Sequence, residues 1–180
     1  MGLDTVELIM GWESAFGIEF SDNEMEVIHT PKMAIDLIAQ KVRVIKSNTE
    51  ICISMRSFYQ IRQGFQTILD LEPQQIKLNS KLLILLPRKQ RQLIWEQIQA
   101  YVGIAKFPSL GFGVGSVFMP VTIQDLVNWT IAYYPTHFVT FEERWTRRQI
   151  RSVVRAVVKD ITGIDDFEDN NDFVTDIGIG

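Results

Sequence analysis

The stretch MGLDTVELIMGWESAFGIEF, residues 1–20, poses the central question about the fold. Its apolar residues recur at helical spacing and predict an amphipathic helix over 3–16 that ends at Gly17. These residues are Leu3, Val6, Leu8, Ile9, Trp12 and Phe16. A helix normally follows a lead-in segment with a capping residue, and almost no chain precedes this one. The segment that covers its start is therefore expected elsewhere in the sequence.

The composition is that of a folded protein. Of 180 residues, 46% are hydrophobic and 22% are charged, which argues against disorder. The net charge of −4 does not favour nucleic-acid binding. The single cysteine, Cys52, excludes an internal disulfide and favours a reducing compartment. No stretch approaches the about 20 apolar residues of a membrane span, and no secretion signal is visible. We therefore expect a cytoplasmic protein that is not associated with a membrane.

Helical periodicity continues along the chain, and no segment alternates apolar and polar residues for long. The expected helices are 3–16, a short turn over 23–28 capped by Ser21 or Asp22, 31–44 capped by Thr30, 54–70, 88–101 after Pro87, 123–134 capped by Thr122, and 146–161. Residues 72–87, 103–120 and 163–180 are expected to be irregular. The expected fold class is all-α.

An internal repeat organises these elements. QIRQGFQTIL at 60–69 resembles QIRSVVRAVV at 149–158, and NSKLLILL at 79–86 corresponds to NNDFVTDI at 170–177. The middle copy continues into a helix that ends in AYVGI, and the chain itself starts with a helix that ends in SAFGI. The middle copy is therefore complete, whereas the other copy is divided between the two ends of the sequence.

The repeat predicts two four-helix bundles. One combines residues 1–45 with 140–180 in circularly permuted order, the other is inserted at 54–135, and 46–53 is a linker. The segment DFVTDIGIG then lies against MGLDTVELIM and supplies the missing lead-in, which is plausible because domain termini commonly lie close together. A domain-swapped dimer would make the same contacts between two chains, so a monomer and a swapped dimer both stay open.

Read in the joined order, FVTDIG at 173–178, GLDTVELIM at 2–10 and FGIEF at 16–20 closely resemble an acyl carrier protein. That family has a long first helix, a loop that ends in Phe-x-x-Asp-Leu-Gly, and Asp-Ser-Leu at the start of the second helix. The resemblance covers residues 1–44 and 145–180, and the middle unit shares it more weakly. It implies that both bundles have the acyl-carrier-protein fold.

The family carries phosphopantetheine on one serine, because the loading enzyme forms a phosphodiester at its hydroxyl. The aligned positions here are Gly2 and, in the middle unit, Arg88, and neither has a hydroxyl. The resemblance therefore implies a non-enzymatic protein-interaction module with no cofactor. Two alternatives stay open. One is a working carrier in fatty-acid, polyketide or peptide synthesis, with phosphopantetheine on Thr5 or Ser80. The other is a small lipid-binding helical protein.

Charged residues provide the candidate partner-binding surface. In the family the second helix is acidic and meets basic patches on partner enzymes, and Asp4, Glu7 and Glu13 keep part of this character. In the middle unit the charged residues at the start of the corresponding helix are basic instead of acidic. Its basic candidates are Arg88, Lys89 and Arg91. The expected partner is a protein, such as a carrier protein or a synthase-type enzyme, and a merely solvated helix face is the alternative for the basic patch.

Other motifs are weaker. GFGVG at 111–115 lacks the spacing of a phosphate-binding loop and is expected to be a connector. The acidic segment 165–176 lacks the glycine and the final glutamate of a calcium loop. His29 and His137 have no second ligand at metal spacing, so no metal site is expected. No nucleophile–base pair suggests a catalytic residue.

Overall fold

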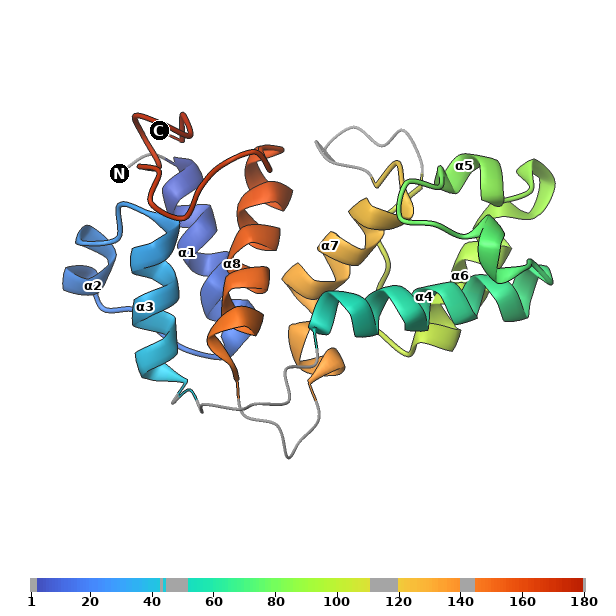
Figure 1. Ribbon diagram of the computed structural model, residues 1–180, viewed down its shortest axis with the longest axis horizontal. Helices are drawn as coiled ribbons and strands as arrows, with labels where there is room; N and C mark the ends of the chain where they lie inside the picture. Colours follow the sequence, from blue (N-terminus) through green and yellow to red (C-terminus); the bar gives the residue numbers. More distant parts are fainter. Residues whose placement is uncertain (1–2, 43, 45–51, 111–119, 140–144, 180) are drawn as a thin grey trace. The chain divides into compact units, whose positions relative to one another are not determined.

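The computed structural model describes residues 3–42, 44, 52–110, 120–139 and 145–179 (Figure 1). These residues contain no β-strand, and their single isolated bridge pairs Lys81 with Thr122. The all-α fold class is therefore confirmed. The chain divides into two compact units: unit 1 comprises Met1–Ile53 and Ile131–Gly180, and unit 2 comprises Ser54–Thr130.

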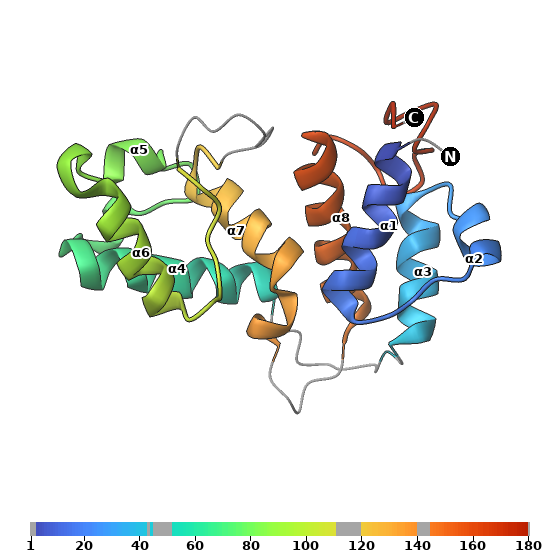
Figure 2. The ribbon, with the colours of Figure 1, turned by 180° about the vertical axis from the view of Figure 1, so that it is seen from behind.

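Unit 1 is built on its last helix. Its elements are α1 (Leu3–Phe16), α2 (Asp22–Glu26), α3 (Pro31–Lys41), the 3₁₀ turn η3 (Pro135–Phe138) and α8 (Arg147–Thr162), with the end of α7 (Ile123–Tyr133) and an irregular C-terminal segment, 163–179. Helices α1 and α3 both pack against α8. The start of α1 and the C-terminal segment lie side by side in two opposite views (Figures 1 and 2).

Local sequence explains why α8 forms and how closely α1 approaches it. Thr146 and Gln149 close a capping box, in which each side chain accepts a hydrogen bond from the other residue's backbone N–H, at 3.3 and 2.9 Å. The helix ends at Gly163, whose φ of +75° suits glycine. A Cβ on Gly11 of α1 would lie 2.7 Å from Val157 Cγ1, so this helix crossing requires a glycine.

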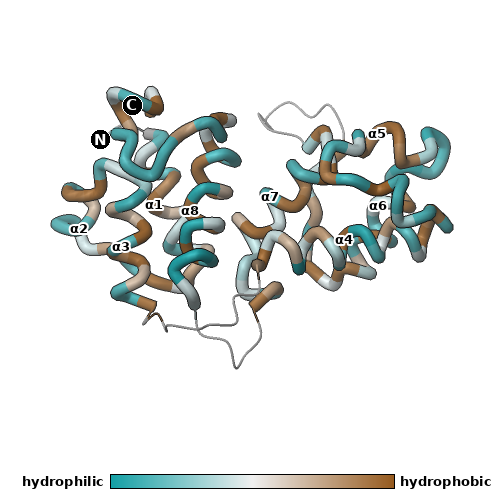
Figure 3. The backbone as a smooth tube through the Cα atoms, viewed as in Figure 1, coloured by the Kyte–Doolittle hydropathy of each residue, from teal (hydrophilic) through white to brown (hydrophobic). Residues whose placement is uncertain are grey.

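The C-terminal segment completes the core of unit 1. Its buried side chains are Phe167, Phe173, Ile177 and Ile179. The ring of Phe173 lies 5.9 Å from that of Trp12 on α1, and the Phe173 N–H donates to the His29 carbonyl at 2.9 Å. The Lys32 N–H in turn donates to the Asp169 carbonyl at 2.8 Å. Hydrophobic and hydrophilic residues alternate along α1, α3 and α8, as expected for helices with one buried face (Figure 3).

Unit 2 repeats this junction in its own segments. Its elements are α4 (Ile53–Leu69, of which Ile53 falls in unit 1), η1 (Pro73–Gln75), α5 (Leu82–Leu85), η2 (Arg88–Gln90), α6 (Arg91–Val102) and α7 as far as Thr130. The Leu82 N–H donates to the Val121 carbonyl at 2.9 Å, and the Gln124 N–H donates to the Leu78 carbonyl at 2.8 Å. Leu82 is fully buried, as Phe173 nearly is in unit 1.

Several predicted boundaries were wrong. The helix expected from residue 88 begins at Arg91, and Arg88–Gln90 form a 3₁₀ turn. The stretch predicted to be irregular contains the single-turn helix α5. Helix α3 ends at Lys41 rather than at residue 44. Most of the predicted linker 46–53 lies outside the described residues, as does all of the GFGVG motif.

Candidate functional site

Helix α1 carries an exposed apolar and acidic face. Val6 and Met10, one helical turn apart, are 42% and 61% exposed. Asp4 and Glu7 are also exposed, and they place two carboxylates beside these apolar side chains. An exposed apolar pair with acidic neighbours suits a partner that presents apolar and basic residues. We call Asp4, Val6, Glu7 and Met10 the α1 face.

The other acidic candidate has a structural contact. The Glu13 carboxylate accepts a hydrogen bond from the Phe20 N–H at 2.8 Å and so holds the chain that follows Gly17. Gly2, aligned with the serine of carrier proteins, lies outside the described residues. Asp4 and Glu7 therefore both lie on the exposed face of α1. Glu13 instead makes a structural hydrogen bond within unit 1.

The basic candidates in unit 2 also divide into exposed and engaged residues. Arg88 and Lys89 are exposed in η2. The Arg91 guanidinium donates from Nη2 to the carbonyls of Leu83 and Leu86, at 3.1 and 3.4 Å, and so supports the end of α5. Only Arg88 and Lys89 of this set are left as surface charges.

The two alternative hydroxyls have different surroundings. Ser80 Oγ accepts from the Lys77 N–H at 2.9 Å and donates to the Gln75 carbonyl at 3.1 Å, so it closes the loop before α5. Thr5 is half-buried on α1. Attachment of an arm at Ser80 would require these loop hydrogen bonds to break.

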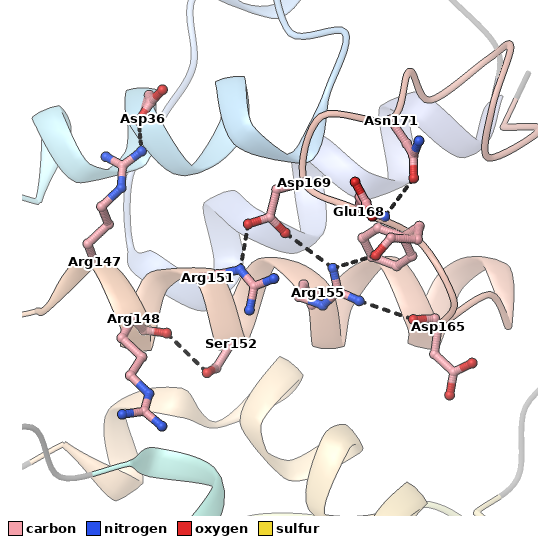
Figure 4. Close-up of polar contacts among 11 residues, drawn as sticks. Asp36, Arg147, Arg148, Arg151, Ser152, Arg155, Asp165, Glu168, Asp169 and Asn171 are labelled. Atoms are coloured by element: carbon pink, nitrogen blue, oxygen red, sulfur yellow. Dashed lines mark hydrogen bonds and ion pairs between the residues drawn. The ribbon is translucent and has the colours of Figure 1, made fainter.

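Sequence reasoning missed a row of basic side chains along α8. The row consists of Arg147, Arg151, Arg155 and Lys159, each four residues after the last. Figure 4 shows its three arginines. The i,i+4 spacing in RRQIRSVVRAVVK was the available signal, because it places these side chains on one helix face. Asp36 pairs with Arg147, Asp169 with Arg151 and Asp165 with Lys159.

Arg155 fastens the C-terminal segment to α8. It donates to the carbonyls of Phe167 and Asp165, at 2.8 and 3.1 Å, and to the Asp169 carboxylate at 3.2 Å. Its guanidinium also lies over the Phe167 ring, 4.1 Å from the centroid. With 25% of its side chain exposed, Arg155 is a structural clamp for this segment.

These contacts lower the pKa values of two aspartates, Asp165 and Asp169. The Lys159 ammonium lowers the pKa of Asp165 through a hydrogen bond and its charge. Burial alone would raise the pKa of Asp169, but the hydrogen bonds and charges of Arg151 and Arg155 outweigh it, so that this pKa is lowered. Both carboxylates are therefore held in the ionised form that the basic row requires.

A further polar contact lies in the last turn of α8. The Tyr133 hydroxyl donates to the Asp160 carboxylate at 2.5 Å. Burial raises the pKa of Tyr133, and the hydrogen bond to Asp160 and the charges of Asp160 and Glu7 add to this effect. Burial also raises the pKa of Asp160, against the opposing effect of the tyrosine hydrogen bond. This pair joins the end of α7 to α8.

The described residues show neither a metal-binding cluster nor a membrane-spanning helix. No group of three or more His, Cys, Asp or Glu side chains in this part of the chain could hold a metal ion. No helix among the same residues is long and apolar enough to cross a bilayer.

Comparison with known proteins found acyl carrier proteins. The chain is 56% identical over 39 residues to the acyl carrier protein of Buchnera aphidicola subsp. Acyrthosiphon pisum (strain Tuc7), which covers 22% of this chain and 49% of the relative. It is 52% identical over 40 residues to the acyl carrier protein of Guillardia theta, with the same coverage. The chain thus spans about half the length of the curated relatives it matches. No family model matches, and no solved structure matches.

Proposed function

We propose that this chain is a carrier-protein-like interaction protein that bears no phosphopantetheine arm and has no enzymatic activity. In this proposal, residues 1–45 and 140–180 together form one circularly permuted carrier-like bundle, and residues 54–135 form a second, unpermuted one. The similarity to acyl carrier proteins over a short segment supports the carrier-type relationship. The α1 face is the surface that meets the partner.

One observation carries the relationship between the two units. In each unit a loop is joined to the start of a threonine-capped helix by two backbone hydrogen bonds at identical residue offsets. The pairs are Phe173–His29 and Lys32–Asp169 in unit 1, and Leu82–Val121 and Gln124–Leu78 in unit 2. In unit 1 the loop comes after the helix in the chain, and in unit 2 it comes before, which is the relation that a permutation produces.

The sequence supports the proposed absence of an arm. Glycine has no side chain, so residue 2 offers no oxygen for a phosphodiester, and Arg88 at the matching position of unit 2 has no hydroxyl either. Of the two alternative hydroxyls, Ser80 is already bonded on both sides within its loop. A chain without an arm retains only its surface for function, and the α1 face is the part of that surface with the family's acidic character.

Intact-mass measurement tests the loss of the arm. The chain is co-expressed with a broad-specificity phosphopantetheinyl transferase, beside a working acyl carrier protein as the positive control. We expect the control to gain the mass of the arm and this chain to gain none. An added arm would contradict the proposal, and peptide mapping would then locate it at Thr5, Ser80 or elsewhere. A Gly2→Ser variant that is loaded when the wild type is not would assign the loss to residue 2.

A matched set of charge reversals tests the α1 face. Asp4→Lys/Glu7→Lys reverses the face, and Glu19→Lys/Glu26→Lys makes the same charge change at exposed positions outside it. Proteins from the native host that bind the wild type and the control variant, but not the reversed face, are the expected partners. If every protein captured by the wild type also binds the reversed face, the α1 face is not the partner surface.

A further inference from the structure

A hollow on unit 1 lies beside the basic row and has no role in the function proposed above. It has a volume of about 360 Å³. It is lined by Lys32 and Ile35 of α3, by Arg147, Arg148 and Arg151 of α8, and by Asp169 and Asn170 of the C-terminal segment. Four of these side chains are basic and one is acidic, so the hollow is electropositive in a chain whose net charge is −4.

We propose that this hollow binds a small phosphate-bearing anion through Lys32, Arg147 and Arg151. The fourth basic residue of the lining, Arg148, is not included, because its side chain points away from Asp169 (Figure 4). The site is separate from the α1 face, because its residues come from α3, α8 and the C-terminal segment.

The ion pairs around the hollow leave hydrogen-bond donors for a ligand. Arg147 pairs with Asp36 through Nη2, which leaves Nη1 and Nε of its guanidinium. Arg151 donates to Asp169 from Nε, which leaves both Nη groups of its guanidinium for a ligand. Asp169 also accepts from Arg155, so this one carboxylate is shared by two guanidinium groups. The side chains of Arg151 and Arg147 are 52% and 55% exposed, compared with 25% for the clamp Arg155. The first two can therefore reach a solvent-borne anion.

The position of the arginines on α8 supports an anionic ligand independently. Arg147 and Arg148 are the first two residues of the helix, where the macrodipole places partial positive charge. Basic side chains there are unfavourable in isolation, and Thr146 and Gln149 already cap the helix without them. An anion in the hollow would offset both the arginine charges and the helix end.

The hydrogen-bond donors that line the hollow indicate which chemical class of ligand it binds. A guanidinium presents two parallel N–H groups that match two phosphate oxygens, and a lysine ammonium adds a point charge. Ile35 is buried and gives the hollow an apolar wall, and the Asn170 amide adds polar capacity. The volume admits a phosphate together with a small organic group, so the shared chemistry is a phosphate dianion, either free or as a monoester.

Isothermal titration at constant ionic strength tests the site, with inorganic phosphate and glycerol phosphate as separate ligands and sodium chloride as the reference. We expect saturable binding of at least one phosphate. We expect Lys32→Ala and Arg151→Lys each to weaken phosphate binding by about tenfold. The first removes a positive charge, and the second removes the paired N–H donors of the guanidinium. Arg151→Lys keeps the positive charge beside Asp169, and circular dichroism checks that both variants fold.

Lys77→Ala is the matched control, since it removes one exposed lysine from unit 2 and should leave the affinity unchanged. Stronger binding of glycerol phosphate would identify an organic monoester as the ligand class, and stronger binding of inorganic phosphate would identify the free anion. Absence of saturable binding, or equal affinities in Lys32→Ala, Arg151→Lys and the wild type, would overturn the proposal. None of these outcomes depends on the α1 face.

Discussion

The junction of loop and helix is the same in both units, but its surroundings differ. In unit 1 the loop that delivers Phe173 lies far along the chain from the helix it contacts, and the basic row of α8 fastens it by ion pairs. In unit 2 the loop that delivers Leu82 precedes its helix, and a single guanidinium, Arg91, supports the carbonyls at its end. The buried anchor and two backbone hydrogen bonds therefore define the junction, and chain order does not.

The helix crossings show the same freedom. Each unit has a glycine at one close approach, but the two glycines lie on different partners. Gly11 on α1 faces Val157 of α8, whereas Gly64 on α4 faces Ile98 and Tyr101 of α6. In the repeat predicted from the sequence, α4 corresponds to α8 and α6 to α1. The two glycines therefore lie on non-equivalent helices of the two units. The packing requires one missing side chain at the crossing and does not specify which helix omits it.

Removal of residues 165–180 would have the largest effect on the comparison. The deletion removes four buried apolar side chains, each worth about 1.5–3 kcal/mol, and their sum is comparable to the stability of a whole domain. We expect unit 1 to unfold or aggregate and unit 2 to keep its helices. Hydrogen exchange resolved by peptide measures this. Unchanged protection of α1 and α3 would contradict the assembly of unit 1 described above.

Matched truncation of the two anchors tests whether the junctions are energetically equal. Phe173→Ala should destabilise unit 1 by about 3–5 kcal/mol, and Leu82→Ala should destabilise unit 2 by about 2–5 kcal/mol. Urea unfolding followed by exchange in each unit separates the two effects. Val174→Ala, next to Phe173 but 62% exposed, is the control and should change stability by less than about 0.5 kcal/mol. Equal losses in both units from either anchor change would show that the units do not respond separately.

Lowering the pH should reduce the free energy of unfolding of unit 1 before that of unit 2. Within the described part of the chain, the carboxyls with lowered pKa all belong to unit 1. These are Glu24, Asp165, Asp169 and Asp172. For Glu24, hydrogen bonds from Lys41 and then from the Ser21 N–H and hydroxyl lower the pKa to about 2. For Asp172, the backbone N–H groups of Thr175 and Val174 lower it.

A carboxyl whose pKa is lowered by folding stabilises the fold above its unfolded value, near pH 4, and this stabilisation disappears as the pH falls through the folded value. We therefore expect the urea midpoint of unit 1 to fall between pH 4 and pH 2. Asp160, whose pKa burial raises, acts in the opposite direction. Asp169→Asn should reduce the acid sensitivity and lower the stability at pH 7 by about 1 kcal/mol. Acid exchange that appears first in α4 and α6 would refute this ranking.

The threonine caps give the smallest expected difference. Thr30 Oγ1 accepts from the Met33 N–H at 3.2 Å, and Thr122 Oγ1 accepts from the Asp125 N–H at the same distance. Thr122 also donates to the Asp125 carboxylate at 2.8 Å, and that carboxylate accepts from the backbone of Val121 and Thr122. Thr30→Ala should cost about 1 kcal/mol and Thr122→Ala about 1–2 kcal/mol. Serine variants at both positions keep the cap and should recover most of the loss.

Sequence periodicity predicted the long helices because each buries a continuous apolar stripe. The expected start of α1 at Leu3 and the Thr30 and Thr122 caps are confirmed, since these features depend on local contacts. The turn at Arg88–Gln90 and the single-turn helix α5 were not predicted, because both depend on tertiary contacts, such as the hydrogen bond from Leu82 to Val121. The site was predicted less completely. Charge alone could not show that Glu13 and Arg91 have partners within their units, nor that the arginines of α8 border a hollow.

The contact between Trp12 and Phe173 also bears on synthesis. A ribosome delivers residues 54–130 long before it reaches Phe173, so unit 2 can fold while the nascent chain is still being made. During that interval the apolar side of α1, with Leu8, Ile9 and Trp12, has none of its C-terminal cover. Translation speed and chaperone access should therefore affect the yield of unit 1 more than that of unit 2.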